Sequence, residues 1–433
     1  MVQIMFDQDL IQKIRAEFPR AAKDFTGRER AFFDNGTGSL VLERAAKNEH
    51  NTRIDYSANI GAIFDESKQA LAYIEQGRQA VAAYLNSPSP DTIISGESAT
   101  KLYFDASYAL GKTFDGTENI VTTELEHYAN VSQWLELERR GKIKEVRFAR
   151  LKKEDGTLDL DHMQELIDSK TKVITVTAAS NMVGTKLPLE AISKLAQEVN
   201  AYYVIDAVHH VPHGPIDVKK IKCDFLNFSM YKLFGPHGSF MFAKEEHIEN
   251  LTPFKVKPSK NYGPFKWESG TRNQAMFAAI AGVMDHFLWL AGEIKPKFKG
   301  KLTEYQDVKR DLKIAMHGIE TYLQGLSKLV LEGFDDVPGL LNIPKVKIYG
   351  ITDINKVDQR DPTFSFAVEN IPHQEVNERL WKEGGIAMRA GNFYSYAQEV
   401  YDQLEILRFS LVHYNTKEEI RTFLTTLNSI CSK

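Results

Sequence analysis

The chain has 433 residues, a length typical of two or three domains, and a chain of this size needs no disulfide or metal to stay folded. Its composition, 43% hydrophobic and 26% charged, argues against a disordered or fibrous protein. A formal net charge of -4 provides no general attraction to nucleic acid or an anionic membrane, and only two cysteines exclude a disulfide framework and suit a reducing compartment.

The N-terminal segment is predicted to be a helix that docks on the body of the protein. Phe6, Leu10, Ile14 and Phe18 recur every four residues, which places them on one helix face, and Pro19 ends the pattern. Acidic and basic residues interrupt every apolar stretch, so the segment does not have the pattern of an export signal. No apolar run approaches the roughly 20 residues of a spanning helix. We therefore predict a cytoplasmic protein that does not enter a membrane.

The middle of the chain alternates short apolar runs with helical patterns. A helix is predicted after Asn130 and another from Pro188, which opens an apolar stripe of helical spacing. Strands are predicted at residues 119–122 (NIVT), 172–178 (KVITVTA), 202–205 (YYVI), 225–228 (FLNF) and 239–243 (SFMFA). Strand, helix and strand at this spacing indicate right-handed βαβ units and an α/β core with a mostly parallel sheet.

The pattern changes after about residue 300. One long helix is predicted at residues 301–333, and it is followed by a strand at 363–368, a helix at 374–382, a short strand near Ile386, a strand at 407–411 and a final helix from Lys417. This order is typical of a smaller α+β domain. We expect three parts: the helix at 1–20, a large domain at 21–300 and a small C-terminal domain at 301–433.

Polar residues follow the ends of the predicted strands, which is where ligands bind in open α/β sheets. Asp206 and Lys232 follow two neighbouring strands, and His127 and Asn181 follow two others. The run at 93–100 (IISGESAT) places glycine and hydroxyl groups at the start of a helix. We expect these groups to meet at one edge of the sheet.

These residue types together indicate one kind of ligand. A glycine–hydroxyl turn at a helix N-terminus binds anions, because free N–H groups and the helix dipole point outward. A lysine partly desolvated among aromatic residues can lose its proton and form a Schiff base, and a neighbouring aspartate can hold a proton on a pyridine nitrogen. Each feature alone is weak, because a lysine after a strand is commonly a solvated surface group and an aspartate there a helix cap. Together they are what pyridoxal phosphate requires.

Eight segments extend this pattern in order along the chain: FFDNGTGSLV, TELEHYANVSQW, SNMVGTKLPL, VIDAVHHVPHGPIDV, FSMYKLFGPHG, WESGTRN, GIAMRAGNFY and LRFSLVHYNTKEEI. Together they resemble the class V aminotransferase family of fold-type I pyridoxal phosphate enzymes, in its cysteine desulfurase-like branch. The resemblance runs from about residue 30 to the end. It implies a PLP-dependent transferase large domain, with a mostly parallel sheet flanked by helices, and a smaller α+β C-terminal domain.

Carried over position by position, the resemblance implies roles around the cofactor ring. Lys232 would form the Schiff base and then shuttle a proton at the substrate α-carbon. Asp206 would pair with the pyridine nitrogen, and His127 would stack on the ring. Asn181 and His209 would contact the ring hydroxyl, and the family usually has glutamine at the position of His209.

The resemblance also implies how the phosphate is bound. Ser98, Ser229 and Tyr231 would bind it, with backbone N–H groups near Glu97, and the family typically has histidine at the position of Tyr231. Thr271 would reach the phosphate in the neighbouring subunit, which implies a homodimer with shared active sites.

The C-terminal segments imply the substrate contacts and contain one departure from the family. Arg408 would clamp the α-carboxylate, because a planar guanidinium matches it, and Arg389 is a second candidate. Desulfurases need a cysteine on the loop after Arg389, and Tyr394 occupies the matching position as a substrate-pocket residue. Neither Cys223 nor Cys431 is placed to replace that cysteine. The standard desulfurase mechanism is therefore not expected.

We expect an enzyme that acts on an α-amino acid through an external aldimine and a quinonoid. It would be a lyase that cleaves a C–S or other β-bond or decarboxylates its substrate, or a transferase. The alternatives are a true cysteine desulfurase with another thiol, an amino-acid epimerase and a catalytically retired PLP-binding scaffold. His209, His210 and His213 could suggest a metal, but no carboxylate or cysteine completes a ligand set at a recognised spacing, so no metal is predicted.

Overall fold

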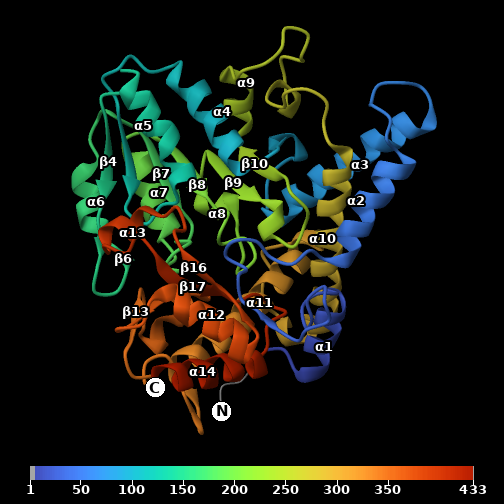
Figure 1. Ribbon diagram of the computed structural model, residues 1–433. Coiled ribbons are helices and arrows are strands. Elements are labelled where there is room, and N and C mark those ends of the chain that lie inside the picture. The colour runs from blue at the N-terminus through green and yellow to red at the C-terminus, as the bar shows by residue number, and fades with distance from the viewer. Residues whose placement is uncertain (1–4, 433) are drawn as a thin grey trace.

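The computed structural model describes residues 5–432 and is built around a seven-stranded sheet (Figure 1). The strand order is β2-β10-β9-β8-β7-β3-β4. β10 runs antiparallel to both of its neighbours, and the other pairs in the sheet are parallel. The strands are β2 (Ile93–Gly96), β3 (Asn119–Thr123), β4 (Glu145–Ala149), β7 (Thr171–Thr177), β8 (Tyr202–Asp206), β9 (Phe225–Ser229) and β10 (Ser239–Ala243). The expected mostly parallel sheet is thus confirmed.

The pleat of this sheet sends successive side chains into two apolar cores, because neighbouring residues in a strand point to opposite faces. Ile94 and Val173 pack in one core with Trp134 and the apolar side of α4. Their neighbours Ile93 and Ile174 pack in the larger core on the other face. The helices that supply these cores are α3 (Asp65–Tyr84), α4 (Ala99–Gly111), α5 (Ser132–Arg139), α7 (Leu189–Glu198) and α10 (Gln274–Ile294).

Helix α10 lies against α3 and α2 (Glu43–Asp55) beside the sheet, as Figure 1 shows. It is long and apolar enough to cross a bilayer, but 78% of its most apolar window is buried inside the protein. A strongly apolar helix that is mostly buried is typical of the core of a globular fold. The larger core also receives α1 (Gln8–Ala16), which is shorter than predicted: Leu10 and Ile14 lie on this helix, Phe6 and Phe18 flank it, and all four side chains are buried.

The C-terminal part forms the lower region of Figure 1, around an antiparallel sheet of order β13-β14-β17-β16. Its elements are α11 (Asp307–Glu332), β13 (Val346–Tyr349), β14 (Thr363–Val368), α12 (His373–Gly384), β15 (Ile386–Ala387), β16 (Arg389–Gly391), α13 (Tyr396–Val400), β17 (Ile406–Ser410) and α14 (Lys417–Cys431). Thr416 caps α14 in a capping box with Glu419. The N-terminal strand β1 (Ala31–Phe32) pairs with β15, so this early segment crosses to the C-terminal part.

The long helix begins later than the pattern at 301–333 predicts. α11 starts at Asp307, and before it the hydroxyl of Tyr305 donates to Asp217 at 2.7 Å. This contact ties the preceding segment to the large sheet domain, so tertiary packing overrides helix propensity there. The boundary at residue 300 stays a prediction. The remaining short elements are β5 (Leu151–Lys152), β6 (Thr157–Leu158), α6 (Leu160–Leu166), α8 (Val218–Ile221), α9 (Glu245–Asn250), β11 (Gly333–Phe334) and β12 (Val337–Pro338).

Candidate functional site

One cavity lies beyond the carboxyl ends of the parallel strands. Both Lys232 and Asp206 line it, so the two groups predicted to meet do face one space. The sequence-predicted residues His127, Asn181, His209, Ser98, Ser229 and Tyr231 line it as well, together with Ala99, Thr100, Tyr103, Ala129, Thr177 and Val208. The strand ends of an α/β sheet supply all of these groups except the α4 residues.

Lys232 ends a short 3-10 turn directly after β9 and is only 8% exposed. Burial, helped by the nearby Arg408, lowers the pKa of its amine to about 8, while the carboxylates Asp206 and Asp34 act in the opposite direction. The loop turns back at once, because the N–H of Met230 donates to the carbonyl of Gly238 at 2.8 Å. About a tenth of the molecules therefore present a neutral Lys232 amine at pH 7, far more than at the ordinary lysine pKa, and the neutral amine is the form that Schiff-base formation requires.

Asp206 is the last residue of β8 and is fully enclosed. Burial raises the pKa of its carboxyl, whereas the N–H of Val208, which donates to Oδ1 at 2.8 Å, Tyr103 and Lys232 oppose that rise. A carboxylate in this position gains most from a cationic partner in the cavity. A protonated ring nitrogen is such a partner.

His127 follows β3 and presents a neutral imidazole to the cavity. Burial, with the charges of Lys232 and Arg408, lowers its pKa to about 3. Its Nδ1 accepts the N–H of Ala129 at 3.0 Å, so Nε2 is the protonated nitrogen. A neutral ring fixed in this way can lie flat against an aromatic cofactor, as the resemblance implies.

Asn181 and His209 line the same cavity from the loops after β7 and β8. The side-chain amide of Asn181 donates to the carbonyl of Phe393 at 3.0 Å, and its Oδ1 is buried without a partner among the described residues. His209 Nε2 lies 2.7 Å from the hydroxyl of Thr363. A buried acceptor left open in the cavity is a position for a ligand hydroxyl.

The phosphate-binding candidates lie at the start of α4 and in the lysine loop. Ser98 is the N-cap of α4, and its hydroxyl accepts the N–H of Lys101 at 3.2 Å. Tyr231 stacks on His237, with ring centroids 5.2 Å apart. Glu97 is exposed and does not line the cavity, so a part for the backbone N–H groups near it stays a prediction. The free N–H groups of α4 make this end suitable for an anion.

Thr271 is exposed and does not line the cavity of its own chain. The prediction that it reaches a neighbouring subunit requires a surface position, and the structure provides one. Its role stays a prediction.

Sequence reasoning missed Thr100, Tyr103 and Thr177 as cavity residues. Thr177 ends β7, so the rule that sites form at strand ends could have found it. Tyr103 is on α4, and the carboxylate of Asp206 adds to the effect of burial in raising its pKa well above the ordinary value. Nothing in the sequence around this helix residue indicates that its side chain lines the cavity.

The two predicted arginines lie side by side, because Arg389 of β16 pairs in register with Arg408 of β17. Arg408 is buried and is not among the residues that line the cavity; it donates to the carbonyl of Asn181, which does line it, at 2.8 Å and to the hydroxyl of Thr37 at 2.9 Å. Arg389 is half-exposed and pairs with Asp34 at 3.1 Å. Burial lowers the pKa of Arg408 to about 10, so its charge persists at neutral pH.

Main-chain hydrogen bonds hold the loop after β16 beside His127. The N–H of Tyr128 donates to the carbonyl of Tyr394 at 2.8 Å, and the N–H of Tyr396 donates to the carbonyl of Glu126 at 2.9 Å. Tyr394 itself is 67% exposed and has a left-handed backbone, with φ of 52°. Its ring centroid lies 6.2 Å from that of His127. Tyr394 thus lies beside the predicted ring-stacking histidine.

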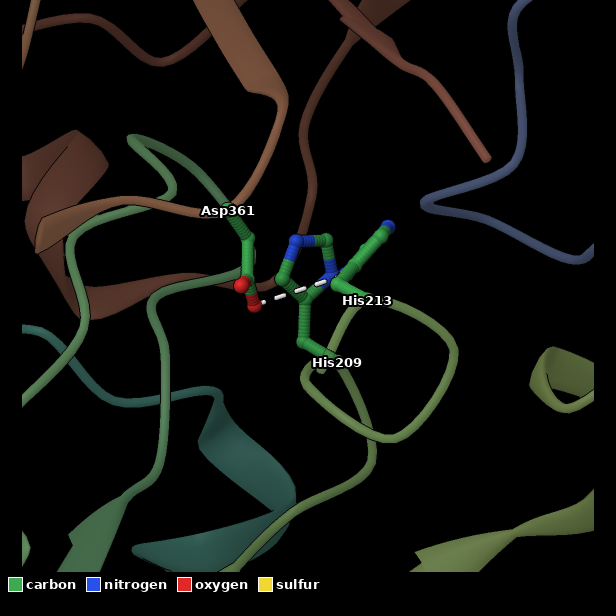
Figure 2. Close-up of side chains that lie close together, drawn as sticks. All are labelled: His209, His213 and Asp361. Atoms are coloured by element: carbon green, nitrogen blue, oxygen red, sulfur yellow. Dashed lines mark ion pairs between the residues drawn. The ribbon is translucent and has the colours of Figure 1, made fainter. Parts of the chain in front are cut away.

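His209 and His213 lie beside Asp361, as Figure 2 shows. One ligand atom from each residue lies within 4.8 Å of the others, and all three side chains are buried. Asp361 precedes β14 and is distant in sequence, so its arrival could not be seen from residue spacing. The prediction that no metal binds here is untested and stays a prediction.

Comparison with known proteins gives a consistent picture. The sequence profile described as aminotransferase class-V matches residues 31–307 and 312–423. A probable cysteine desulfurase from Streptomyces coelicolor is 30% identical, over 88% of this chain and 87% of its own length. An aminotransferase-like protein from Gibberella zeae is 28% identical, over 97% of this chain and 98% of its own length.

The fold of solved cysteine desulfurases is similar. The apo structure from Thermococcus onnurineus superposes with a TM-score of 0.82 at 22% identity, covering 97% of this chain and 98% of that one. The fold predicted from the sequence, that of the fold-type I PLP-dependent transferases, is therefore confirmed.

Class V aminotransferases and cysteine desulfurases are pyridoxal phosphate enzymes, and the residues present here fit that cofactor. The cavity is lined by a buried amine, a buried carboxylate, an amide whose oxygen has no partner among the described residues, and a helix N-terminus. These donors and acceptors match an aldehyde, a pyridine nitrogen, a ring hydroxyl and a phosphate. The family match agrees with the cofactor and the enzyme class that the sequence predicts. The chain belongs to the class V aminotransferases, which are PLP-dependent enzymes.

Proposed function

We propose that this protein is a PLP-dependent lyase that removes the α-proton of a small amino acid and expels its β-substituent, with a C–S bond as the preferred target. The bound cofactor supplies an electron sink for the charge that develops at the α-carbon. Lys232 takes the α-proton, and the β-substituent leaves with the bonding electron pair and is protonated as a thiol. Arg408 binds the α-carboxylate.

One observation supports this choice over persulfide chemistry. The loop position that matches the desulfurase nucleophile is Tyr394, while both cysteines, Cys223 and Cys431, are buried away from the cavity. Burial raises the pKa of both thiols, so neither is a ready thiolate. A lyase needs no sulfur acceptor on the chain, because the leaving group departs as a small molecule.

The test mixes the holoenzyme with cysteine, a thioether amino acid, alanine and aspartate. We expect thiol or sulfide, together with keto acid, from the first two only, and equal rates from the Cys223→Ser, Cys431→Ser double variant. Loss of sulfide release in the double variant would show a thiol-dependent desulfurase instead. If no amino acid changed the absorbance of the bound cofactor, the protein would be a catalytically retired PLP-binding scaffold instead.

We also propose that the protein works as a cytoplasmic homodimer. Large apolar side chains stand exposed at Ile63, Phe64, Phe254, Val256 and Tyr262, and a homodimer interface would remove such side chains from water. The two free cysteines suit a reducing compartment.

A further inference from the structure

A buried carboxylate joins two segments at the edge of the large sheet. Glu268 lies two residues after a 3-10 turn at Pro264–Lys266, and its side chain is 3% exposed. Its Oε1 accepts the N–H and the hydroxyl of Ser95, at 2.8 and 2.6 Å. Its Oε2 accepts from the guanidinium groups of Arg78 and Arg272, each at 2.5 Å. Each oxygen thus has two donors, and all four contacts are of the strong, charge-assisted kind.

The pair of Arg78 and Glu268 occupies the free side of β2. Among the described strands, β2 is at the edge of the sheet and has only β10 beside it. Along such a strand every second residue turns its N–H and C=O away from the sheet. On that side Arg78 donates to the carbonyl of Ile93, and Glu268 accepts the N–H of Ser95. The ion pair therefore replaces a neighbouring strand and fixes the last residues of β2.

The end of β2 leads directly into the phosphate end of the cavity. Ser95 lies three residues before Ser98, which is the N-cap of α4, and Ser98, Ala99 and Thr100 line the cavity. The cofactor phosphate is predicted to bind here through N–H groups that have no partner within the helix. Hydrogen bonds to an anion depend on direction as well as distance, so a small displacement of this turn weakens several of them together.

The same carboxylate closes the loop that contains Thr271. Glu268 and Arg272 lie on either side of Thr271, and their ion pair brackets this exposed residue. Gly270 has a left-handed backbone, with φ of 75°, which allows the tight turn. Directly after Arg272, Asn273 caps the core helix α10. The residue predicted to reach the phosphate of the neighbouring subunit is therefore held between the ion pair and α10.

We propose that Glu268 is a positioning residue for two phosphate sites: through Ser95 it sets the phosphate-binding turn of its own subunit, and through Arg272 it holds Thr271 toward the phosphate of the neighbouring subunit. Glu268 itself does not line the cavity. The inference deepens the proposed function, because it rests on the cofactor site and on the homodimer. It concerns how tightly the phosphate group is held and not the reaction of the amino acid.

The test compares pyridoxal phosphate with pyridoxal, which lacks the phosphate. Each is titrated into the full-length chain after removal of its cofactor, and absorbance measures binding. Glu268→Gln keeps the size of the side chain but loses its charge and turns one acceptor into a donor. We expect roughly tenfold weaker binding of pyridoxal phosphate, which the loss of one charge-assisted contact can cause, and binding of pyridoxal within about twofold of wild type.

Ser95→Ala is a milder variant for the same comparison. It removes one of the four donors and should weaken binding of pyridoxal phosphate alone, by about threefold. It supplies the result if the Glu268 variant does not fold. An equal loss for the two forms of the cofactor would mean that Glu268 has only a structural role. Unchanged affinity for both forms would equally overturn the proposal.

Mixed dimers, isolated with two affinity tags, separate the two sites. When one chain carries Lys232→Ala, only the site of the other chain keeps its amine, and the absorbance reports that site. Arg272→Gln on the Lys232→Ala chain should weaken binding of pyridoxal phosphate there, because that chain supplies Thr271. The same substitution on the chain that keeps Lys232 should not. Any other pattern would overturn the role toward the neighbouring subunit.

Asp224→Asn is the matched control. Asp224 is another buried carboxylate that accepts a main-chain N–H, from Tyr203 at 2.7 Å, and pairs with a cation, Lys244, at 2.7 Å. It lies before β9, at the opposite end of that strand from Lys232. Its variant should bind both forms as the wild type does, and a selective loss of pyridoxal phosphate would overturn the proposal. Wild-type protein that binds neither form would refute the proposed function itself, and a monomeric wild type would refute the homodimer.

Discussion

Lys232 and Lys313 show at the scale of single residues that a lowered pKa does not by itself define a reactive amine. Burial lowers the pKa of Lys313 to about 7, close to the value of about 8 for Lys232. The Lys313 amine, however, is held by the main-chain carbonyls of Tyr84 and Ile216, whereas Lys232 faces the cavity. Borohydride reduction of the holoenzyme should therefore attach the cofactor to Lys232 alone, and a labelled Lys313 peptide would contradict this assignment.

The Lys232 pKa also predicts a pH dependence. Only the unprotonated amine condenses with an aldehyde, so the rate at which apo-protein captures the cofactor should increase roughly tenfold per pH unit below the pKa and level off above about 8. Stopped-flow absorbance measures this rate. A rate that is constant through the pH range around that midpoint would mean that the amine is not the titrating group.

The sequence predicted the residues at strand ends but not their partners from elsewhere in the chain. Asp206, Lys232, His127 and Asn181 were found because a parallel sheet places its strand ends at one edge. Asp361 reaches the histidines only through packing of β14 against the loop after β8, and no periodicity encodes such a contact.

At the scale of helices, the contact between α3 and α10 depends on a glycine. A Cβ on Gly77 would lie 2.6 Å from the carbonyl oxygen and 2.8 Å from the Cα of Phe277, so backbone would have to move. We expect Gly77→Ala to lower the free energy of unfolding by about 1–3 kcal/mol. Denaturant unfolding followed by circular dichroism measures this change.

Gly292 of α10 is the matched control for this substitution. It is exposed, and nothing lies within 4 Å of an added Cβ, so Gly292→Ala should stabilise the helix by up to about 1 kcal/mol. Destabilisation by both variants would contradict the assignment of the effect at Gly77 to close packing.

Helices and strands with clear periodicity were predicted almost to the residue, including β14 and the start of α14 at Lys417. The start of α11 was not, because a tertiary contact of Tyr305 decides it. Pairing of β1 with β15 was also beyond sequence reasoning, since two-residue strands have no period.

At the scale of the whole molecule, the proposed homodimer with shared active sites makes a prediction about mixed dimers. Lys232→Ala should lack the essential amine, and Thr271→Asp should repel the phosphate of the neighbouring subunit. In co-expressed protein half of the dimers are mixed, and each mixed dimer has one intact site, so activity should return to about a quarter of the wild-type value. Tandem affinity tags isolate the mixed dimers for assay. Mixed dimers as inactive as both parents would place Thr271 outside a shared site.

The main-chain hydrogen bonds between Tyr128 and Tyr394 and between Tyr396 and Glu126 join the loop after β16 to the segment that holds the His127 imidazole. A displacement of that loop is therefore expected to move the imidazole with it. Motion of Tyr394 and motion of the His127 ring should be observed together, and not one without the other.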